Sequence, residues 1–128
     1  MSFEVGASVA FEALHRQPVE GPEGELHAHQ YRLDVVVERA ELDARGMVCD
    51  LDLLNAALHE VVGQIEGRNL EFIRPEWAES VTVEVLARWG HGALSEAVRL
   101  AGGETLLVRV YESDTEFGGY RAPLAPAT

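Results

Sequence analysis

The chain has 128 residues, which is enough for one compact domain and too few for two independent cores. Its 22 acidic residues and 10 basic residues give a formal net charge of −12, and every basic residue is an arginine. An acidic surface of this size repels phosphate groups, so we expect neither nucleic acid nor an anionic membrane as a partner. The absence of lysine excludes Schiff-base and Walker-type lysine chemistry.

The single cysteine, Cys49, cannot form a disulfide within one chain, and the first residues do not look like an export signal. No apolar run approaches the roughly 20 residues that a membrane-spanning helix needs. A hydrophobic content of 47% is typical of a globular protein. We therefore expect a cytoplasmic protein.

Two segments near the N-terminus alternate between apolar and polar residues, a pattern typical of half-buried strands. The first covers residues 2–15 and the second residues 27–38. The proline- and glycine-rich stretch between them, residues 17–25, predicts a loop. Two strands joined by one loop normally pair antiparallel, so these segments predict a hairpin.

Two helical patterns follow a predicted turn at residues 43–47. Residues 50–65 carry apolar side chains at helical spacing, with Asp50 or Asp52 as the capping acid. After the break at residues 74–75, a second helical pattern runs from about residue 81 to residue 98 and ends at a glycine pair.

The C-terminal part returns to a strand pattern over residues 104–113, with a short last strand at residues 118–121. The resulting order β-β-α-α-β-β predicts an α+β fold, in which an antiparallel sheet carries two helices on one face. We expect a single domain over residues 1–122 and a C-terminal tail over residues 123–128.

Three histidines are predicted to meet at one end of this sheet. His27 and His29 are two residues apart in a strand and therefore project from the same face. His15 ends the preceding strand, and a hairpin places that end beside the start of the next strand. Three neutral imidazoles with an open fourth position are typical of a catalytic zinc site. The alternative is that these three are hydrogen-bonded core residues. His59 and His91 lie in the helical segments and are interpreted as surface or packing residues.

Five segments resemble the motifs of a known protein family. They occur in the same order as in the family and are spread over nearly the whole chain. They are FEALH at residues 11–15, HAHQY at 27–31, GMVCDLDLL at 46–54, TVEVLARW at 82–89 and VRVYES at 108–113. Together they resemble the 6-pyruvoyltetrahydropterin synthase and 6-carboxytetrahydropterin synthase family. The resemblance implies a tunnelling fold (T-fold), a β-β-α-α-β-β unit that assembles into homo-oligomeric rings, either trimers or hexamers.

The resemblance also implies a site for a small-molecule pterin, chiefly 7,8-dihydroneopterin triphosphate. Zinc would be held by His15, His27 and His29. Glu112 matches the glutamate that grips the edge of the pterin ring, since a carboxylate can accept two parallel hydrogen bonds. Thr82 matches a threonine that contacts the pterin. The alternatives are a solvated acid for Glu112 and a plain helix cap for Thr82.

The chain departs from the family pattern at the catalytic base. The family uses a cysteine upstream of the HxH motif, and that position falls on Glu23, while the family's Asp-His pair is absent from the matching stretch, residues 65–71. Cys49 lies elsewhere and is interpreted as an inert packing residue. Some family members carry a glutamate near the cysteine position and cleave the pterin side chain. Glu23 and Glu25 are therefore the candidates for the base, with a solvated acidic loop as the alternative.

These features predict a zinc-dependent lyase acting on 7,8-dihydroneopterin or its triphosphate. The alternative functions are a catalytically inactive zinc- and pterin-binding protein and a structural oligomer whose histidines bind no metal. A triphosphate would need local arginines in so acidic a chain, and Arg16 and Arg32 are the candidates. A pocket without arginine would favour an unphosphorylated pterin.

Overall fold

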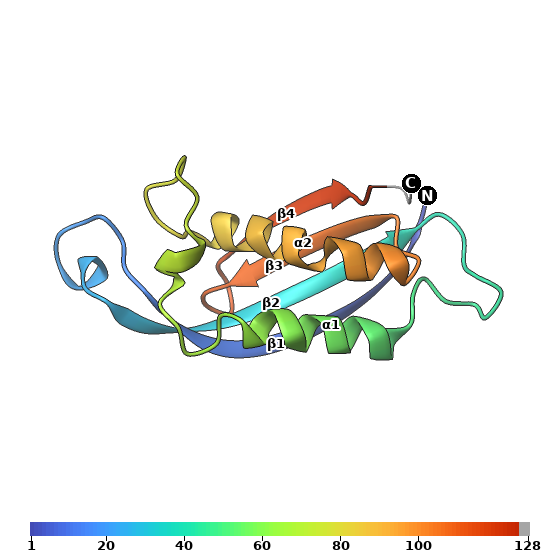
Figure 1. The fold of residues 1–128 in the computed structure, drawn as a ribbon, viewed down its shortest axis with the longest axis horizontal. Helices are drawn as coiled ribbons and strands as arrows, with labels where there is room; N and C mark the ends of the chain where they lie inside the picture. The colour runs from blue at the N-terminus through green and yellow to red at the C-terminus, as the bar shows by residue number, and fades with distance from the viewer. Residues whose placement is uncertain (126–128) are drawn as a thin grey trace.

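The computed structural model of the chain describes residues 1–125, except for the side chain of Glu23. Two helices lie against one face of a four-stranded antiparallel sheet with strand order β1-β2-β3-β4 (Figure 1). The elements are β1 (Phe3–His15), β2 (His27–Arg39), α1 (Leu51–Gly63), α2 (Val83–Leu100), β3 (Thr105–Tyr111) and β4 (Phe117–Pro123). The predicted element order and the placement of both helices on one face are confirmed.

The hairpin of β1 and β2 is the longest feature of the fold. Its register runs from the pair Phe3–Arg39 to the pair His15–His27, so each of the 13 residues of β1 faces a residue of β2. Alternate residues of both strands point toward the helices, as the period of two in the sequence requires. The loop that joins the strands extends beyond the ends of the helices (Figure 1).

Side-chain caps fix the start of each helix. The carboxylate of Asp50 accepts hydrogen bonds from the backbone N–H groups of Asp52 and Leu53 at 2.8 and 3.3 Å. The hydroxyl of Thr82 accepts one from the N–H of Val85 at 3.1 Å. These bonds satisfy donors that the first helical turn leaves without an intrahelical partner.

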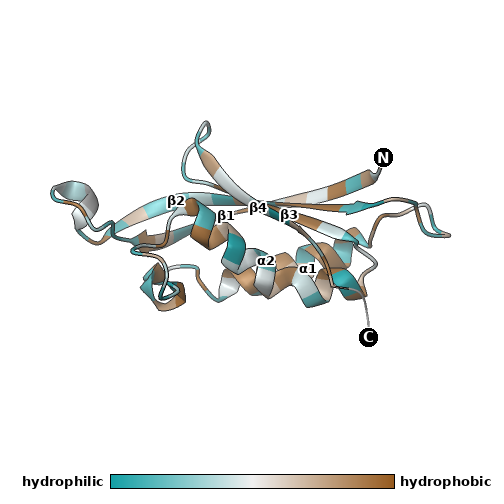
Figure 2. Ribbon diagram, turned by 90° about the horizontal axis from the view of Figure 1, so that it is seen from above, coloured by the Kyte–Doolittle hydropathy of each residue, from teal (hydrophilic) through white to brown (hydrophobic). Residues whose placement is uncertain are grey.

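The core lies between the helices and the sheet. Its fully buried side chains come from the inner faces of α1, α2, β2 and β3; they include Leu33, Val35, Leu54, Leu58, Leu86, Leu94, Leu106 and Val108. The opposite face of the sheet carries no helix (Figure 2). That open face holds ion pairs between Arg32 and Asp34 and between Arg121 and Glu38.

At the C-terminal end, β4 reaches Pro123, next to the predicted domain boundary at residue 122. Leu124 is buried, and its N–H donates a hydrogen bond to the carbonyl of Glu104. Residues 126–128 of the predicted tail lie outside the described residues. Within the described part of the chain, no helix is both long enough and apolar enough to cross a membrane.

Candidate functional site

The imidazole rings of three histidines are neighbours at one end of the β1–β2 hairpin. His15 and His27 form the last pair of the register, and His29 lies two residues further along β2 on the same face. The ring centroids are 5.5 Å apart for His15 and His27, 5.7 Å for His15 and His29, and 4.6 Å for His27 and His29. The predicted convergence of the three rings therefore follows from the register of one hairpin.

The surroundings of the histidine cluster favour ring nitrogens that can bind a metal ion. His15 is only 4% exposed, and Nε2 of His27 is buried. Nδ1 of His27 lies 2.7 Å from the carbonyl oxygen of Glu25 and donates its hydrogen there. This bond selects the tautomer whose lone pair is on Nε2, the arrangement found in histidines that bind metals.

Three imidazole rings at this spacing are suitable ligands for a metal ion. Their side-chain orientations in the structure do not yet form a metal site. Rings that each place a nitrogen about 2.0–2.1 Å from one tetrahedral ion have centroids about 5 Å apart. Among the described residues, however, no group of three or more His, Cys, Asp or Glu side chains is arranged to hold a metal ion.

A pocket of about 170 Å³ joins this cluster to the start of α2 and the end of β3. Its walls are formed by His15, Gln17, Tyr31, Val81, Thr82, Val83, Glu84 and Glu112. Three of the residues singled out from the sequence, His15, Thr82 and Glu112, therefore face one cavity. The cavity is smaller than most ligand sites, which enclose about 300–1,000 Å³.

Glu112 is half-buried and directly follows β3. Since Tyr111 faces Arg32 in the register, the next position places Glu112 opposite Tyr31, on the inner face of the sheet. Burial raises the pKa of the Tyr31 hydroxyl, and the neighbouring Glu112 carboxylate raises it further. Tyr31 is thus a neutral hydroxyl beside a carboxylate at the floor of the pocket.

Thr82 has two roles in the geometry. Its hydroxyl caps α2 by accepting a hydrogen bond from the N–H of Val85. Thr82 also lines the pocket. A hydroxyl that accepts from a backbone N–H keeps its own hydrogen for another acceptor, so capping and ligand contact are compatible.

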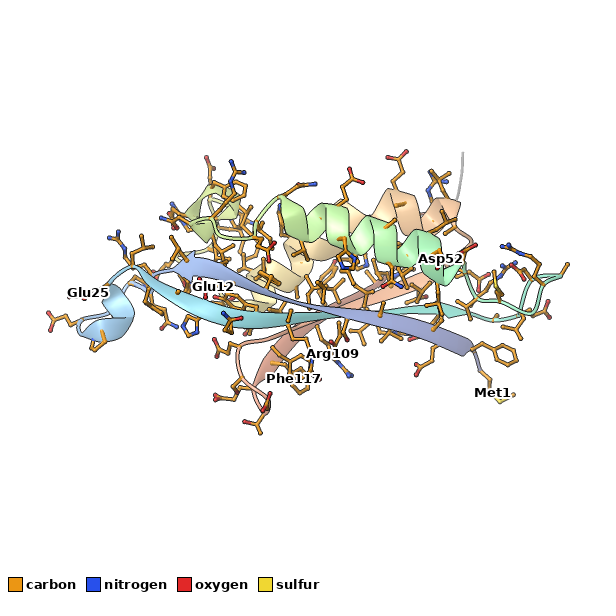
Figure 3. All side chains as sticks on the ribbon, turned by 90° about the horizontal axis from the view of Figure 1, so that it is seen from below. Met1, Glu12, Glu25, Asp52, Arg109 and Phe117 are labelled. Carbon is orange, nitrogen blue, oxygen red and sulfur yellow. The ribbon has the colours of Figure 1, made fainter. Side chains whose placement is uncertain are left out.

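The two candidate bases lie in the β1–β2 loop. Glu23 is in the short 3-10 helix Pro22–Gly24, and its side chain lies outside the described part of the structure. Glu25 is exposed and lies at the far end of the molecule, beyond the paired strands (Figure 3). Its backbone carbonyl, which holds His27, is the part of Glu25 that contacts the histidine cluster.

Cys49 is buried next to the start of α1 and does not line the pocket. Burial raises the pKa of its thiol, and the Asp50 carboxylate adds to the rise. The stretch that corresponds to the family's Asp-His pair, residues 65–71, forms a turn against the end of β1. There the N–H of Gly67 donates to the carbonyl of Glu12, and the N–H of Leu14 donates to the carbonyl of Arg68.

Neither of the arginines proposed for phosphate binding lines this pocket. Arg32 projects from the open face of the sheet, where it pairs with Asp34 at 3.0 Å and lies 3.9 Å above the ring of Tyr111. Arg16 lines a different hollow together with two glutamates, Glu71 and Glu79. The described lining of the 170 Å³ pocket contains two carboxylates and no arginine.

The remaining histidines occupy one surface position, His59, and one buried packing position, His91. His59 is exposed, and its Nδ1 donates to the carbonyl of Asn55 one turn earlier in α1. His91 is buried between α2 and β4, with Nε2 3.3 Å from the carbonyl oxygen of Ala122.

Tyr31 lines the pocket, but the sequence motifs did not predict it as a site residue. It lies on the same face of β2 as His27 and His29.

The sequence and the fold of the chain were compared with those of known proteins. Residues 4–123 match the sequence model of the 6-pyruvoyl tetrahydropterin synthase family. No curated protein sequence matches the chain.

Solved structures of 6-pyruvoyl tetrahydropterin synthases share the fold. The Plasmodium falciparum enzyme has a TM-score of 0.78 and 16% identity, with 95% of this chain and 98% of that chain covered. The Caenorhabditis elegans enzyme has a TM-score of 0.70 and 21% identity, with coverages of 95% and 96%. The Plasmodium vivax enzyme has a TM-score of 0.79 and 14% identity, with coverages of 96% and 99%. Two further P. vivax structures are catalytic-residue mutants in which a glutamate is replaced by cysteine or alanine.

Proposed function

The chain belongs to the 6-pyruvoyl tetrahydropterin synthase family, whose members are pterin-processing lyases, and we propose that it is a zinc-dependent lyase that cleaves the side chain of a 7,8-dihydropterin. The observation that carries the proposal is the pocket shared by His15, Thr82 and Glu112. It joins a cluster of nitrogen donors to a carboxylate that can hold a pterin ring.

His15, His27 and His29 would hold the zinc ion through one ring nitrogen each. The strands already bring the three rings together, so ligation requires the rings to turn about their side-chain torsions without a change of register. When bound there, zinc supplies a Lewis acid that polarises the oxygens of the substrate side chain. The hydrogen bond from His27 Nδ1 to the Glu25 carbonyl would orient the ring and leave Nε2 as the nitrogen that binds the metal.

Glu112 and Thr82 would hold the ring end of the substrate. The Glu112 carboxylate accepts hydrogen bonds from the ring N–H and the exocyclic amine, a bidentate pairing that also fixes the orientation of the ring. The Thr82 hydroxyl donates its hydrogen to an acceptor on the ring. The small size of the pocket limits it to one part of the substrate, with the side chain extending toward the histidines.

A glutamate of the β1–β2 loop would be the proton acceptor, in place of the cysteine used elsewhere in the family. The P. vivax enzyme, which has the same fold, also has a glutamate as a catalytic residue. We propose Glu23 or Glu25 for this role. Changing each to glutamine, with Glu20→Gln from the same loop as the matched control, identifies which one it is, since only the base should lower turnover strongly.

The proposed activity is tested by incubating the zinc-loaded protein with 7,8-dihydroneopterin and with its triphosphate, followed by chromatographic analysis of the products. We expect a dihydropterin with a shortened side chain, 6-hydroxymethyl-dihydropterin. Unchanged substrate, with zinc bound and both loop glutamates intact, would overturn the proposal. Calorimetric binding of the pterin without turnover would instead favour the inactive zinc- and pterin-binding alternative.

We also propose that the protein is a homo-oligomer, a trimer or a hexamer, located in the cytoplasm, with residues 1–122 as its domain. The sheet ends in two edge strands, β1 and β4, and an edge strand can pair with another chain. The end of β1 is already bonded to residues 67–68 through Glu12 and Leu14, so the earlier part of β1 and the edge of β4 are the candidate pairing edges. Light scattering coupled to size-exclusion chromatography distinguishes a monomer, a trimer and a hexamer. A monomer at micromolar concentration would contradict the oligomer.

A further inference from the structure

Tyr31 is held rigidly at the floor of the pocket. It lies in β2, two residues after His29 on the same face, and is only 4% exposed. Its ring stacks on that of Phe11, with centroids 5.4 Å apart and an interplanar angle of 23°. The ring of His29, two residues earlier on the same strand, is 5.7 Å away. These two ring contacts restrict the direction of the phenol.

The hydroxyl of Tyr31 makes no hydrogen bond with any of the described residues, although the Glu112 carboxylate is close enough to act on its charge. The residue as a whole is buried, but its hydroxyl oxygen is not among the buried polar atoms that lack a partner. Because Tyr31 lines the pocket together with His15 and Glu112, this accessible hydroxyl can reach a molecule bound there. A ligand in the pocket would therefore supply its hydrogen-bond partner.

Tyr31 also stands between the two ends of the proposed site. Glu112, the proposed ring-binding carboxylate, occupies the facing register position next to β2. His29, a proposed zinc ligand, is a neighbour of the Tyr31 ring on the same strand. A substrate that reaches from Glu112 to the histidines would therefore pass Tyr31 at the point where its ring joins its side chain.

We propose that the Tyr31 hydroxyl donates a hydrogen bond to the bound dihydropterin at the ring nitrogen next to the carbon that carries the side chain. This inference rests on the proposed function. When the side chain is cleaved, the electron pair left on the carbon attached to the ring delocalises onto that nitrogen. A fixed donor at this position stabilises the developing charge without giving up its proton.

The variant Tyr31→Phe tests the inference, because it removes the hydroxyl and keeps the ring that Phe11 and His29 contact. Loss of one donor to developing charge should lower kcat about 100- to 1,000-fold, with a much smaller change in KM. Zinc content and Tm should match those of the wild type. The matched control is Tyr111→Phe, which removes a hydroxyl from the open face of the sheet and should leave kcat unchanged.

A second measurement keeps the inference separate from the proposed activity. Pterin binding to the metal-free protein, followed by fluorescence, should weaken about 3- to 10-fold in Tyr31→Phe, the loss expected for one hydrogen bond. Wild-type binding with an unchanged affinity in Tyr31→Phe, or an unchanged kcat, would overturn the role of Tyr31 alone. A wild type that binds no pterin would overturn the proposed function and this inference with it.

Discussion

At the residue scale, the surroundings of Cys49 make its thiol unsuitable as a catalytic group. The thiol is buried beside the Asp50 carboxylate, and both effects raise its pKa. A raised pKa leaves less thiolate at neutral pH, and the thiolate is the reactive form. The family's thiol chemistry therefore has no counterpart at Cys49, which fits its position outside the pocket.

We predict that Cys49→Ala leaves kcat for the pterin within about twofold of the wild type, because a packing residue contributes to stability and not to proton transfer. We also expect iodoacetamide to alkylate the native thiol much more slowly than the thiol of the urea-unfolded chain. Mass spectrometry of timed reactions measures this difference. Fast alkylation in the native protein, or loss of turnover in the variant, would show that Cys49 is a working nucleophile.

We propose that pterin recognition depends on the Glu112 carboxylate. Glu112→Gln removes the charge while keeping the size, and charge-assisted hydrogen bonds contribute about 1.5–3 kcal/mol, so pterin affinity should fall about 10- to 100-fold. Glu116→Gln is the matched control, since Glu116 is exposed in the adjacent turn. Isothermal titration calorimetry compares the two variants. Equal affinities would leave Glu112 as a solvated strand-end acid.

At the element scale, the first turn of α2 connects the stability of the fold to the site. The residue that caps this helix also lines the pocket. In contrast, Asp50 caps α1 and has no position in the pocket lining. The two caps therefore allow the structural role of a capping side chain to be separated from a role in binding.

Thr82→Ala and Asp50→Ala should each lower the free energy of unfolding by about 1 kcal/mol, the usual cost of losing a helix cap. Only Thr82→Ala should also weaken pterin binding, and Thr82→Ser should restore both properties because it keeps the hydroxyl. Urea unfolding and calorimetry give the two quantities. If Asp50→Ala weakens binding as much as Thr82→Ala, the effect of Thr82 is indirect and its contact with the pterin is absent.

The elements themselves are predictable from local patterns. The alternation of apolar and polar residues predicted both strands of the N-terminal hairpin. The helical spacing of apolar residues predicted the bounds of both helices to within a few residues. The two short 3-10 helices, Pro22–Gly24 and Leu70–Ile73, have no such signal, because three or four residues are too few to show a period. The helix caps were visible in the sequence, whereas the approach of α2 to the end of β3 depends on tertiary packing.

The same distinction applies to the site. The histidine cluster is predictable because a hairpin register alone brings His15 beside His27. Glu112 and Thr82 were predicted as site residues only through the family resemblance. Their position in one pocket with His15 depends on the packing of α2 on the sheet. Tyr31 escaped prediction because an aromatic residue on an inner strand face is usually a core residue.

At the scale of the whole molecule, charge bears on the choice of substrate. The chain carries a formal net charge of −12, and the described lining of the pocket has two carboxylates and no arginine. A triphosphate approaching such a surface is repelled, while an uncharged side chain is not.

We therefore predict that kcat/KM is higher for 7,8-dihydroneopterin than for its triphosphate at low ionic strength. Raising the salt concentration from about 0.01 M to 0.15 M shortens the Debye length from about 30 Å to 8 Å and should raise kcat/KM for the triphosphate while leaving that for dihydroneopterin nearly unchanged. Steady-state kinetics at both salt concentrations measures this. A preference for the triphosphate that weakens with salt would contradict this prediction and reveal a cationic subsite.

We propose that the register of one hairpin brings His15, His27 and His29 together as a zinc site. The most direct test of this claim is the zinc content of purified protein after equilibration with zinc and gel filtration, for the wild type, His29→Ala and the matched control His59→Ala. We predict about one zinc ion per chain in the wild type and in His59→Ala, and none in His29→Ala. A wild type that retains no zinc, or a His29→Ala variant that retains as much as the wild type, would contradict the claim.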